Sequence, residues 1–208
     1  MNELASIIPA AGLGTRMRGG DKLTEEVGGI PLLRRIAEMA RSVCDPVIVA
    51  LPVPAAARGG ALEGLDVTRV AVPDAAEGMA RSLVRAAAAL PETCRGILVM
   101  PADMPEITAP DLATLARVFD AEGGQRIVRA TTEDGAPGHP VIFPRRFRSA
   151  LMQLTGDQGA RDVLMAEAEA GRVLHVPLPG RRARVDLDTP EDWAAWRAGQ
   201  RAVSARDD

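Results

Sequence analysis

The chain has 208 residues, 47% of them hydrophobic, and carries a net charge of −3 at pH 7. This length suits one α/β domain, and the slight negative charge argues against a general nucleic-acid-binding protein, whose surface is usually basic. No apolar run approaches the ~20 residues that span a membrane, and the first residues lack the basic segment of a signal peptide. Cys44 and Cys94 have no metal-binding spacing, so we expect a cytoplasmic protein with reduced, buried thiols.

Short apolar runs alternate with segments of helical periodicity along the first half of the chain. This pattern predicts an α/β fold with a Rossmann-like, mostly parallel sheet and helices on both faces. The expected strands are Leu4–Ile8, Pro46–Leu51, Val67–Val72 and Gly96–Met100. The expected helices are Pro31–Ser42, with its proline at the start, Met79–Leu90, and Asp111–Ala121, with Pro110 just ahead of it.

The second half is less regular and predicts a small β-containing insertion in this part of the fold. The expected strands here are Arg126–Ala130, Pro140–Phe143, Val173–Val176 and Val185–Leu187, the first two joined by the polar turn 133–135. The expected helices are Arg145–Gln153, Gln158–Ala170 and a last helix from Pro190. We therefore expect one domain over residues 1–199 and a polar tail, residues 200–208, that frays.

A glycine-rich loop follows the first expected strand and contains Lys22, the single lysine of a chain with 24 arginines. The small residues Ala10, Ala11, Gly12 and Gly14 allow the backbone to approach a phosphate closely, and successive N–H groups then form a concave anion site. The compact ammonium of a lysine can follow a moving phosphate better than a rigid guanidinium. Lys22 is either retained for this chemistry or a surface lysine left by codon bias.

Carboxylates follow two further expected strands. Ligands of open parallel sheets bind at the carboxyl ends of the strands, where Asp103 stands between two prolines. It is either a turn-forming residue or a ligand for a divalent cation that bridges phosphate oxygens. Asp186 and Asp188 share one face if their strand extends that far. Thr189 and Asp192 are explained by a capping box at the start of the last helix.

These segments, in this order, resemble the molybdenum cofactor cytidylyltransferase type of nucleotidyltransferase. The resemblance rests on residues 10–17 followed by Lys22, on residues 102–105 and on residues 186–192, and it spans nearly the whole chain. It implies transfer of CMP from CTP to the phosphate of molybdenum-molybdopterin, with Mg²⁺ as cofactor and release of pyrophosphate. It also implies transient contact with a molybdenum hydroxylase or its chaperone.

The resemblance also implies roles for individual residues. The catalytic residues are Arg16, Lys22 and Asp103, and the Mg²⁺ ligands are Asp103 and Asp186, with Asp188 as the alternative second ligand. The nucleotide-binding residues are Ala10, Ala11, Gly12, Leu13, Gly14, Thr15, Arg16, Lys22, Gly78, Ser82 and Asp103. The acceptor-binding residues are Gly138, His139, Pro140, Gly156, Asp157 and Arg161. The last three belong to a segment similar to the GD-x-GAR segment of enzymes that act on molybdopterin, although Asp157 also suits a turn before a helix and His139 a strand edge.

Other functions stay open at this point. The same chemistry with GTP as donor, or with a sugar phosphate as acceptor, is the nearest alternative, but sugar-phosphate enzymes usually have more than the ~100 residues that follow the fourth strand here. A non-catalytic carrier of molybdenum cofactor would not need the set Lys22, Asp103 and Asp186. A dinucleotide-dependent oxidoreductase is disfavoured because Met17 stands where the third glycine of its loop is expected.

Overall fold

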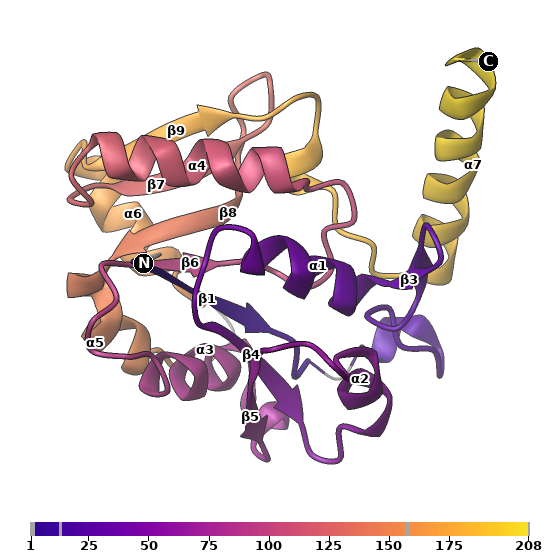
Figure 1. The fold of residues 1–208 in the computed structure, drawn as a ribbon, viewed down its shortest axis with the longest axis horizontal. Helices are drawn as coiled ribbons and strands as arrows, with labels where there is room; N and C mark the ends of the chain where they lie inside the picture. Colours follow the sequence, from indigo (N-terminus) through magenta and orange to yellow (C-terminus); the bar gives the residue numbers. More distant parts are fainter. Residues whose placement is uncertain (1–2, 13, 157–158, 208) are drawn as a thin grey trace.

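The computed structural model describes residues 3–12, 14–156 and 159–207. A seven-stranded sheet, in the order β5-β4-β1-β6-β8-β7-β9, runs through the molecule with helices on both faces (Figure 1). Strand β8 is antiparallel to β6 and β7, whereas the other pairs are parallel, so the predicted mostly parallel α/β sheet is confirmed. The strands are β1 (Leu4–Pro9), β4 (Val47–Pro52), β5 (Thr68–Val72), β6 (Gly96–Val99), β7 (Ile127–Thr131), β8 (Pro137–Pro144) and β9 (Val173–Pro177).

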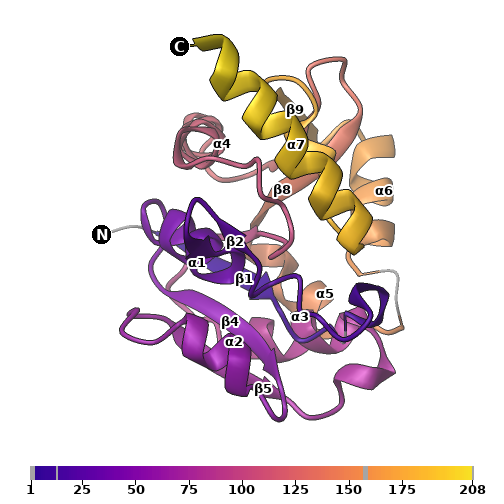
Figure 2. The same ribbon diagram turned by 90° about the vertical axis from the view of Figure 1, so that its right-hand side faces the viewer.

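Two apolar cores lie on opposite faces of the sheet, because side chains alternate along each strand. In β1, Ile8 belongs to one core and Ile7 to the other. The first core contains residues of α1 (Leu32–Arg41), α4 (Ala109–Ala121) and the start of α7 (Pro190–Asp207), and the second contains residues of α3 (Met79–Ala88), α5 (Arg148–Met152) and α6 (Arg161–Glu169). Figure 2 shows α7 running past the carboxyl ends of the strands and away from the sheet.

Small elements connect these layers. A hairpin of β2 (Glu26–Val27) and β3 (Ile30–Pro31) leads into α1, and the short helix α2 (Ala56–Ala61) follows β4. Four single turns of 3₁₀ helix are η1 (Thr15–Met17), η2 (Ala75–Glu77), η3 (Arg145–Phe147) and η4 (Arg182–Arg184). No helix within the described ranges is long and apolar enough to cross a membrane. Cys44 and Cys94 are buried and unpaired, as predicted.

Proline positions differ from the prediction in two helices. Pro31 belongs to β3 and precedes α1 with extended backbone, instead of forming its first turn. Pro110 lies inside the first turn of α4, whose N-terminus is fixed by a capping box between Thr108 and Asp111. The helix therefore begins earlier than predicted, because this cap satisfies the first N–H groups.

The predicted strand Val185–Leu187 is wrong. These residues follow η4 without strand pairing, and Val185 and Leu187 pack into the first core instead. The backbone N–H of Leu187 donates to the carbonyl of Asp103 at 3.3 Å, which holds this segment against the end of β6.

Three helical predictions change in extent. The predicted helix Arg145–Gln153 divides into η3 and the short α5, and α6 starts at Arg161 rather than at Gln158, which lies outside the described residues. The last helix continues through residues 200–207, which the sequence led us to treat as a separate tail.

Candidate active site

Lys22 lies between two carboxylates at the carboxyl edge of the sheet. Its Nζ donates to Asp103 Oδ2 and to Asp188 Oδ1, both at 2.6 Å. A second cation, Arg16, contacts the other oxygen of Asp188 at 2.5 Å. Asp103 follows β6 and Lys22 follows the loop after β1, so the parallel arrangement of these strands brings the two together as predicted.

Lys22 carries a permanent positive charge in this cluster. Burial alone would lower its pKa, but attraction to and hydrogen bonding with Asp103, together with the bond to Asp188, outweigh burial and raise the pKa above the usual lysine value. Its side chain is only 16% exposed, whereas that of Arg16 is 69% exposed. Lys22 therefore stays charged over the physiological pH range, while Arg16 can turn toward a ligand from solvent.

Asp186 completes a group of three carboxylates. Burial of its carboxyl group, followed by the negative charges of Asp103 and Asp188, raises the pKa of Asp186 above the usual range. Asp188 is already paired with Lys22 and Arg16, whereas Asp186 forms no ion pair within the part of the chain that the structure describes. This difference favours Asp186 over Asp188 as the partner of Asp103 in holding a cation.

Arg58 in α2 forms hydrogen bonds to three residues of the glycine-rich loop. Its guanidinium pairs with Asp21 through two bonds, Nε to Oδ2 at 2.6 Å and Nη2 to Oδ1 at 3.0 Å. Its Nη1 donates to the carbonyls of Ala10 and Gly12 at 2.6 and 2.8 Å. One side chain, 6% exposed, therefore ties the start of the loop to the residue next to Lys22.

The loop itself adopts the conformations that its glycines permit. Gly14 has φ of +60°, which favours glycine, and an added Cβ would lie 3.7 Å from the Arg58 guanidinium. Arg18 at the far end pairs with Glu191 of α7 at 2.8 Å, with both side chains exposed. Leu13, predicted to contribute its backbone, lies outside the described residues, and Thr15 begins η1.

The segments predicted to bind the nucleotide and the acceptor meet at the start of α3. Gly78 caps this helix with φ of +119°, and Ser82 is buried in its first turns. The backbone N–H of Ala80 donates to the carbonyl of Gly156 at 3.2 Å. Gly156 thus lies beside the predicted nucleotide-binding helix, whereas its neighbour Asp157 lies outside the described residues.

The remaining predicted acceptor residues lie in β8 and at the start of α6. His139 Nδ1 is buried without a hydrogen-bond partner in the structure. Burial and then the positive charge of Arg129 lower the pKa of His139 to about 4, against the opposing effect of Asp103. Pro140 is buried in β8, and Arg161 is the first, exposed residue of α6. The structure therefore brings His139 near Asp103.

A family model described as "MobA-like NTP transferase domain" matches residues 6–171. The chain belongs to this family. The matched range covers the loop, Lys22 and Asp103, but ends before Asp186 and Asp188. The predicted resemblance to nucleotidyltransferases is thus confirmed at the level of the family.

Curated relatives of the chain differ in length. The probable molybdenum cofactor guanylyltransferase of Synechococcus elongatus is 31% identical over 92% of this chain and 96% of that protein. The bifunctional protein GlmU of Leifsonia xyli subsp. xyli is 29% identical over 82% of this chain, but the chain spans only 35% of the length of that protein.

Solved structures show the same fold. Rv0371c from Mycobacterium tuberculosis H37Rv superposes with a TM-score of 0.78 and 27% identity, covering 92% of this chain and 95% of that one. A second structure of that protein, described as a complex with manganese, has a TM-score of 0.73 at the same identity and covers 92% of this chain and 96% of that one.

The carboxylate donors of this site fit a small divalent cation. Asp103 and Asp186 supply hard carboxylate oxygens. Burial, and after it the negative charge of Asp103, raises the pKa of Asp186, and a positive ion would relieve both effects. Across the described residues, no group of three or more acidic, histidine or cysteine side chains is arranged to hold a metal ion. Two protein carboxylates would therefore share such an ion with water and phosphate oxygens, as is common for Mg²⁺.

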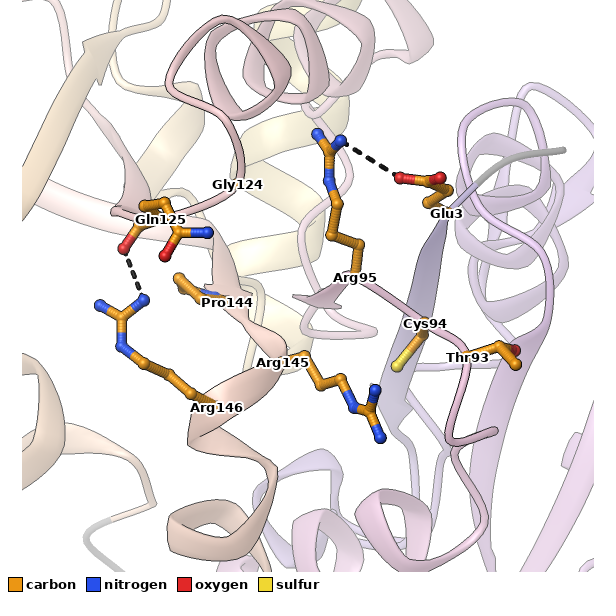
Figure 3. A pocket seen from close by; sticks show the side chains of 9 residues that line it. All are labelled: Glu3, Thr93, Cys94, Arg95, Gly124, Gln125, Pro144, Arg145 and Arg146. Carbon is orange, nitrogen blue, oxygen red and sulfur yellow. Dashed lines mark hydrogen bonds and ion pairs between the residues drawn. The ribbon is translucent and has the colours of Figure 1, made fainter.

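A separate cleft of about 330 Å³ opens at the opposite edge of the sheet (Figure 3). It lies where β6 begins and β8 ends, and its lining includes Arg95, Arg145 and Arg146. Arg95 there is neutralised by Glu3 and Asp120. None of the predicted site residues lines this cleft, so it does not contribute to the carboxylate cluster.

The sequence analysis missed Arg58. It stands in an Ala-Ala-Ala-Arg-Gly-Gly stretch that has no amphipathic pattern and did not predict α2. Its role depends on where this short helix lies over the loop, which no local pattern encodes. The one sequence signal was Asp21 beside Lys22, an acidic residue in a loop expected to bind anions.

Proposed function

We propose that the protein transfers CMP from CTP to the phosphate of molybdenum-molybdopterin and releases pyrophosphate. The observation that carries this proposal is the position of Lys22, the single lysine, between Asp103 and Asp188 beside the glycine-rich loop. The relative of matching length named as a molybdenum cofactor guanylyltransferase supports molybdopterin as acceptor.

The choice of CTP rests on the segment Gly156–Arg161, which is similar to that of cytidylyltransferases acting on molybdopterin. Transfer of GMP from GTP is the second candidate, because the curated relatives that match over most of their length include molybdenum cofactor guanylyltransferases. Both candidates use the same cluster and differ only in the base recognised.

Positioning and charge neutralisation are the tasks of this site. The acceptor phosphate is already ionised at neutral pH, so no general base is needed, and the barrier arises because one anion must attack another. The backbone amides of residues 12–15 would cradle the donor triphosphate. Arg16 and Lys22 would leave Asp188 and bind the triphosphate, where they stabilise the charge that grows on the leaving pyrophosphate.

Asp103 and Asp186 would hold Mg²⁺ or Mn²⁺, and manganese in the Rv0371c complex supports a divalent ion in this fold. When bound, such an ion supplies positive charge to the phosphate oxygens. In the free protein, Lys22 satisfies the Asp103 carboxylate instead. Lys22 would therefore move from Asp103 to the triphosphate when the donor binds, which would leave the Asp103 carboxylate available to help hold a divalent ion.

The test is pyrophosphate release with Mg²⁺ and each of the four nucleoside triphosphates, with and without molybdopterin. The proposal expects release only with CTP and molybdopterin together; release with GTP would support the second candidate. Asp103→Asn should abolish turnover while the matched surface variant Asp120→Asn, 64% exposed, stays active. Release that is independent of molybdopterin, or an active Asp103→Asn enzyme with unchanged metal dependence, would contradict the proposal.

A further inference from the structure

Arg129 and Arg184, two arginines beside the Gly138–His139 segment of β8, have no acidic partner among the residues that the structure describes. Arg129 in β7 is half-buried, and its Nε donates only to the backbone carbonyl of Gly138, at 3.0 Å. Arg184, the last residue of η4, has no ion pair with any side chain that the structure describes. Burial and then the charge of Arg184 lower the pKa of Arg129, so the two guanidinium groups lie close enough to repel each other.

Backbone packing fixes the arginines in this arrangement. A Cβ built on Gly138 would lie 2.0 Å from the carbonyl oxygen of Ala183, so η4 rests directly on β8 at a position that only glycine can occupy. Arg184 follows Ala183, and Arg129 is bonded to Gly138 itself. The close approach of two backbones, and not side-chain flexibility, therefore brings the like charges together.

These arginines belong to segments that approach Asp103, because Leu187, three residues after Arg184, donates its backbone N–H to the Asp103 carbonyl at 3.3 Å. His139 follows Gly138 in β8, and the charges of Arg129 and Asp103 both affect its pKa, Arg129 lowering it and Asp103 raising it. Its Nδ1 is buried without a partner, although buried polar groups are normally hydrogen-bonded. Two uncompensated guanidiniums and an unsatisfied imidazole nitrogen, next to a carboxylate expected to hold the metal, form an incomplete site that an anion would complete.

We propose that Arg129 and Arg184 bind the phosphate monoester of the acceptor, with His139 as a third contact. This rests on the proposed function, because it assigns the acceptor half of the same site. Arg16 and Lys22 are committed to the donor triphosphate, so the acceptor phosphate needs cations of its own. A guanidinium fork matches two phosphate oxygens at once, which fixes the direction of attack as well as the charge.

The binding experiment titrates inorganic phosphate by calorimetry into protein that holds a non-hydrolysable CTP analogue and Mg²⁺, so that the front loop is already occupied. Arg184→Gln and Arg129→Gln should each weaken phosphate binding about tenfold or more. The matched control is Arg181→Gln, which removes the same charge from the residue before η4, where it faces Asp134. It should bind phosphate as the unaltered protein does.

The kinetic experiment measures both substrates. Arg184→Gln should raise the KM for molybdopterin about tenfold or more while the KM for CTP stays within twofold. Unchanged phosphate affinity in Arg184→Gln, or a rise in the KM for CTP instead, would overturn the proposal. Since Arg184 is exposed, its replacement leaves the core intact, and Arg129→Lys provides a second variant that keeps the charge but loses the fork.

Failure of the proposed function gives a different result. If the CTP analogue does not bind, the donor assignment fails, yet phosphate binding that depends on Arg129 and Arg184 would still be seen in the same titration. If the analogue binds and phosphate binding is insensitive to both arginines, only the acceptor site is wrong.

Discussion

Replacement of Arg58 by alanine tests whether the glycine-rich loop depends on a single brace. Arg58 is 6% exposed and forms four hydrogen bonds, two to the carboxylate of Asp21 and two to the carbonyls of Ala10 and Gly12. Its loss removes the cation paired with Asp21, whose carboxylate keeps only the bond from the Leu23 N–H at 3.1 Å among the described contacts, and it removes the side-chain donor to the two carbonyls. We therefore expect both global stability and nucleotide binding to fall.

The size of the expected stability loss depends on how exposed Arg58 and Asp21 are. Removing one partner of a buried ion pair costs about 3–5 kcal/mol. Asp21 keeps 25% exposure and can be hydrated, which places the expected loss near the lower end, about 3 kcal/mol. For a chain of this size, a loss of about 3 kcal/mol lowers Tm by about 6–12 °C. Part of the same loss appears in ligand binding, as an about 10–100-fold rise in the KM for the nucleotide.

The assays are urea unfolding and pyrophosphate release at several nucleotide concentrations. Arg58→Lys retains the charge but cannot reach all three partners, so it should recover less than half of the lost stability. The control is Arg117→Ala, an exposed residue of α4 whose guanidinium contacts only Thr114 of the same helix. A KM for the nucleotide unchanged in Arg58→Ala would refute the idea that this side chain shapes the loop, whatever the effect on stability.

Three further predictions follow from single contacts. Lys22→Arg should lower kcat about 100-fold or more in single-turnover assays, because a guanidinium fork cannot replace the ammonium between Asp103 and Asp188; near-normal turnover would show that any cation suffices. The free energy of unfolding should fall by up to about 3 kcal/mol as the pH drops from about 6.5 to 4. The reason is that the pKa of His139 is lowered to about 4 in the folded protein, so only the unfolded chain gains the proton in this range. Urea unfolding of the unaltered protein and His139→Asn at pH 7 and pH 4.5 measures this, and an equal acid loss in both would be inconsistent with a neutral buried imidazole. Gly138→Ala should destabilise the fold by about 3 kcal/mol or more, because its Cβ would meet the Ala183 carbonyl. The control Gly60→Ala, in open space within α2, should stabilise the fold by about 0.5–1 kcal/mol. Equal melting temperatures of the two variants would contradict the close approach of Gly138 and Ala183.

The core elements of this fold are predictable from sequence because they carry strong local patterns. The strands β1, β4 and β6 correspond to almost continuous apolar runs, as expected for strands covered on both faces. The edge strand β5 contains Thr68 and Arg69 and is largely exposed. The segments after β1 and β6 could be placed at the same edge because parallel strands share their carboxyl ends. This topological rule predicts that Lys22 and Asp103 lie close together, and their side chains form an ion pair.

Other features depend on tertiary contacts that a sequence pattern does not show. Val185–Leu187 has the composition of a strand, yet its apolar side chains pack into a core and its backbone bonds to Asp103 instead of a neighbouring strand. Arg58 and Arg129 stand among small or apolar residues with no motif around them. Their roles arise from the placement of α2 under the loop and of η4 against Gly138.

The most direct test of the central claim follows the α-phosphate. The protein is incubated with Mg²⁺, molybdenum-molybdopterin and CTP labelled with ³²P at the α-position, and the products are separated. The account predicts that the label enters a pterin dinucleotide while the released pyrophosphate carries none. Label recovered only as CMP or CDP, with the pterin unchanged, would contradict nucleotidyl transfer to this acceptor.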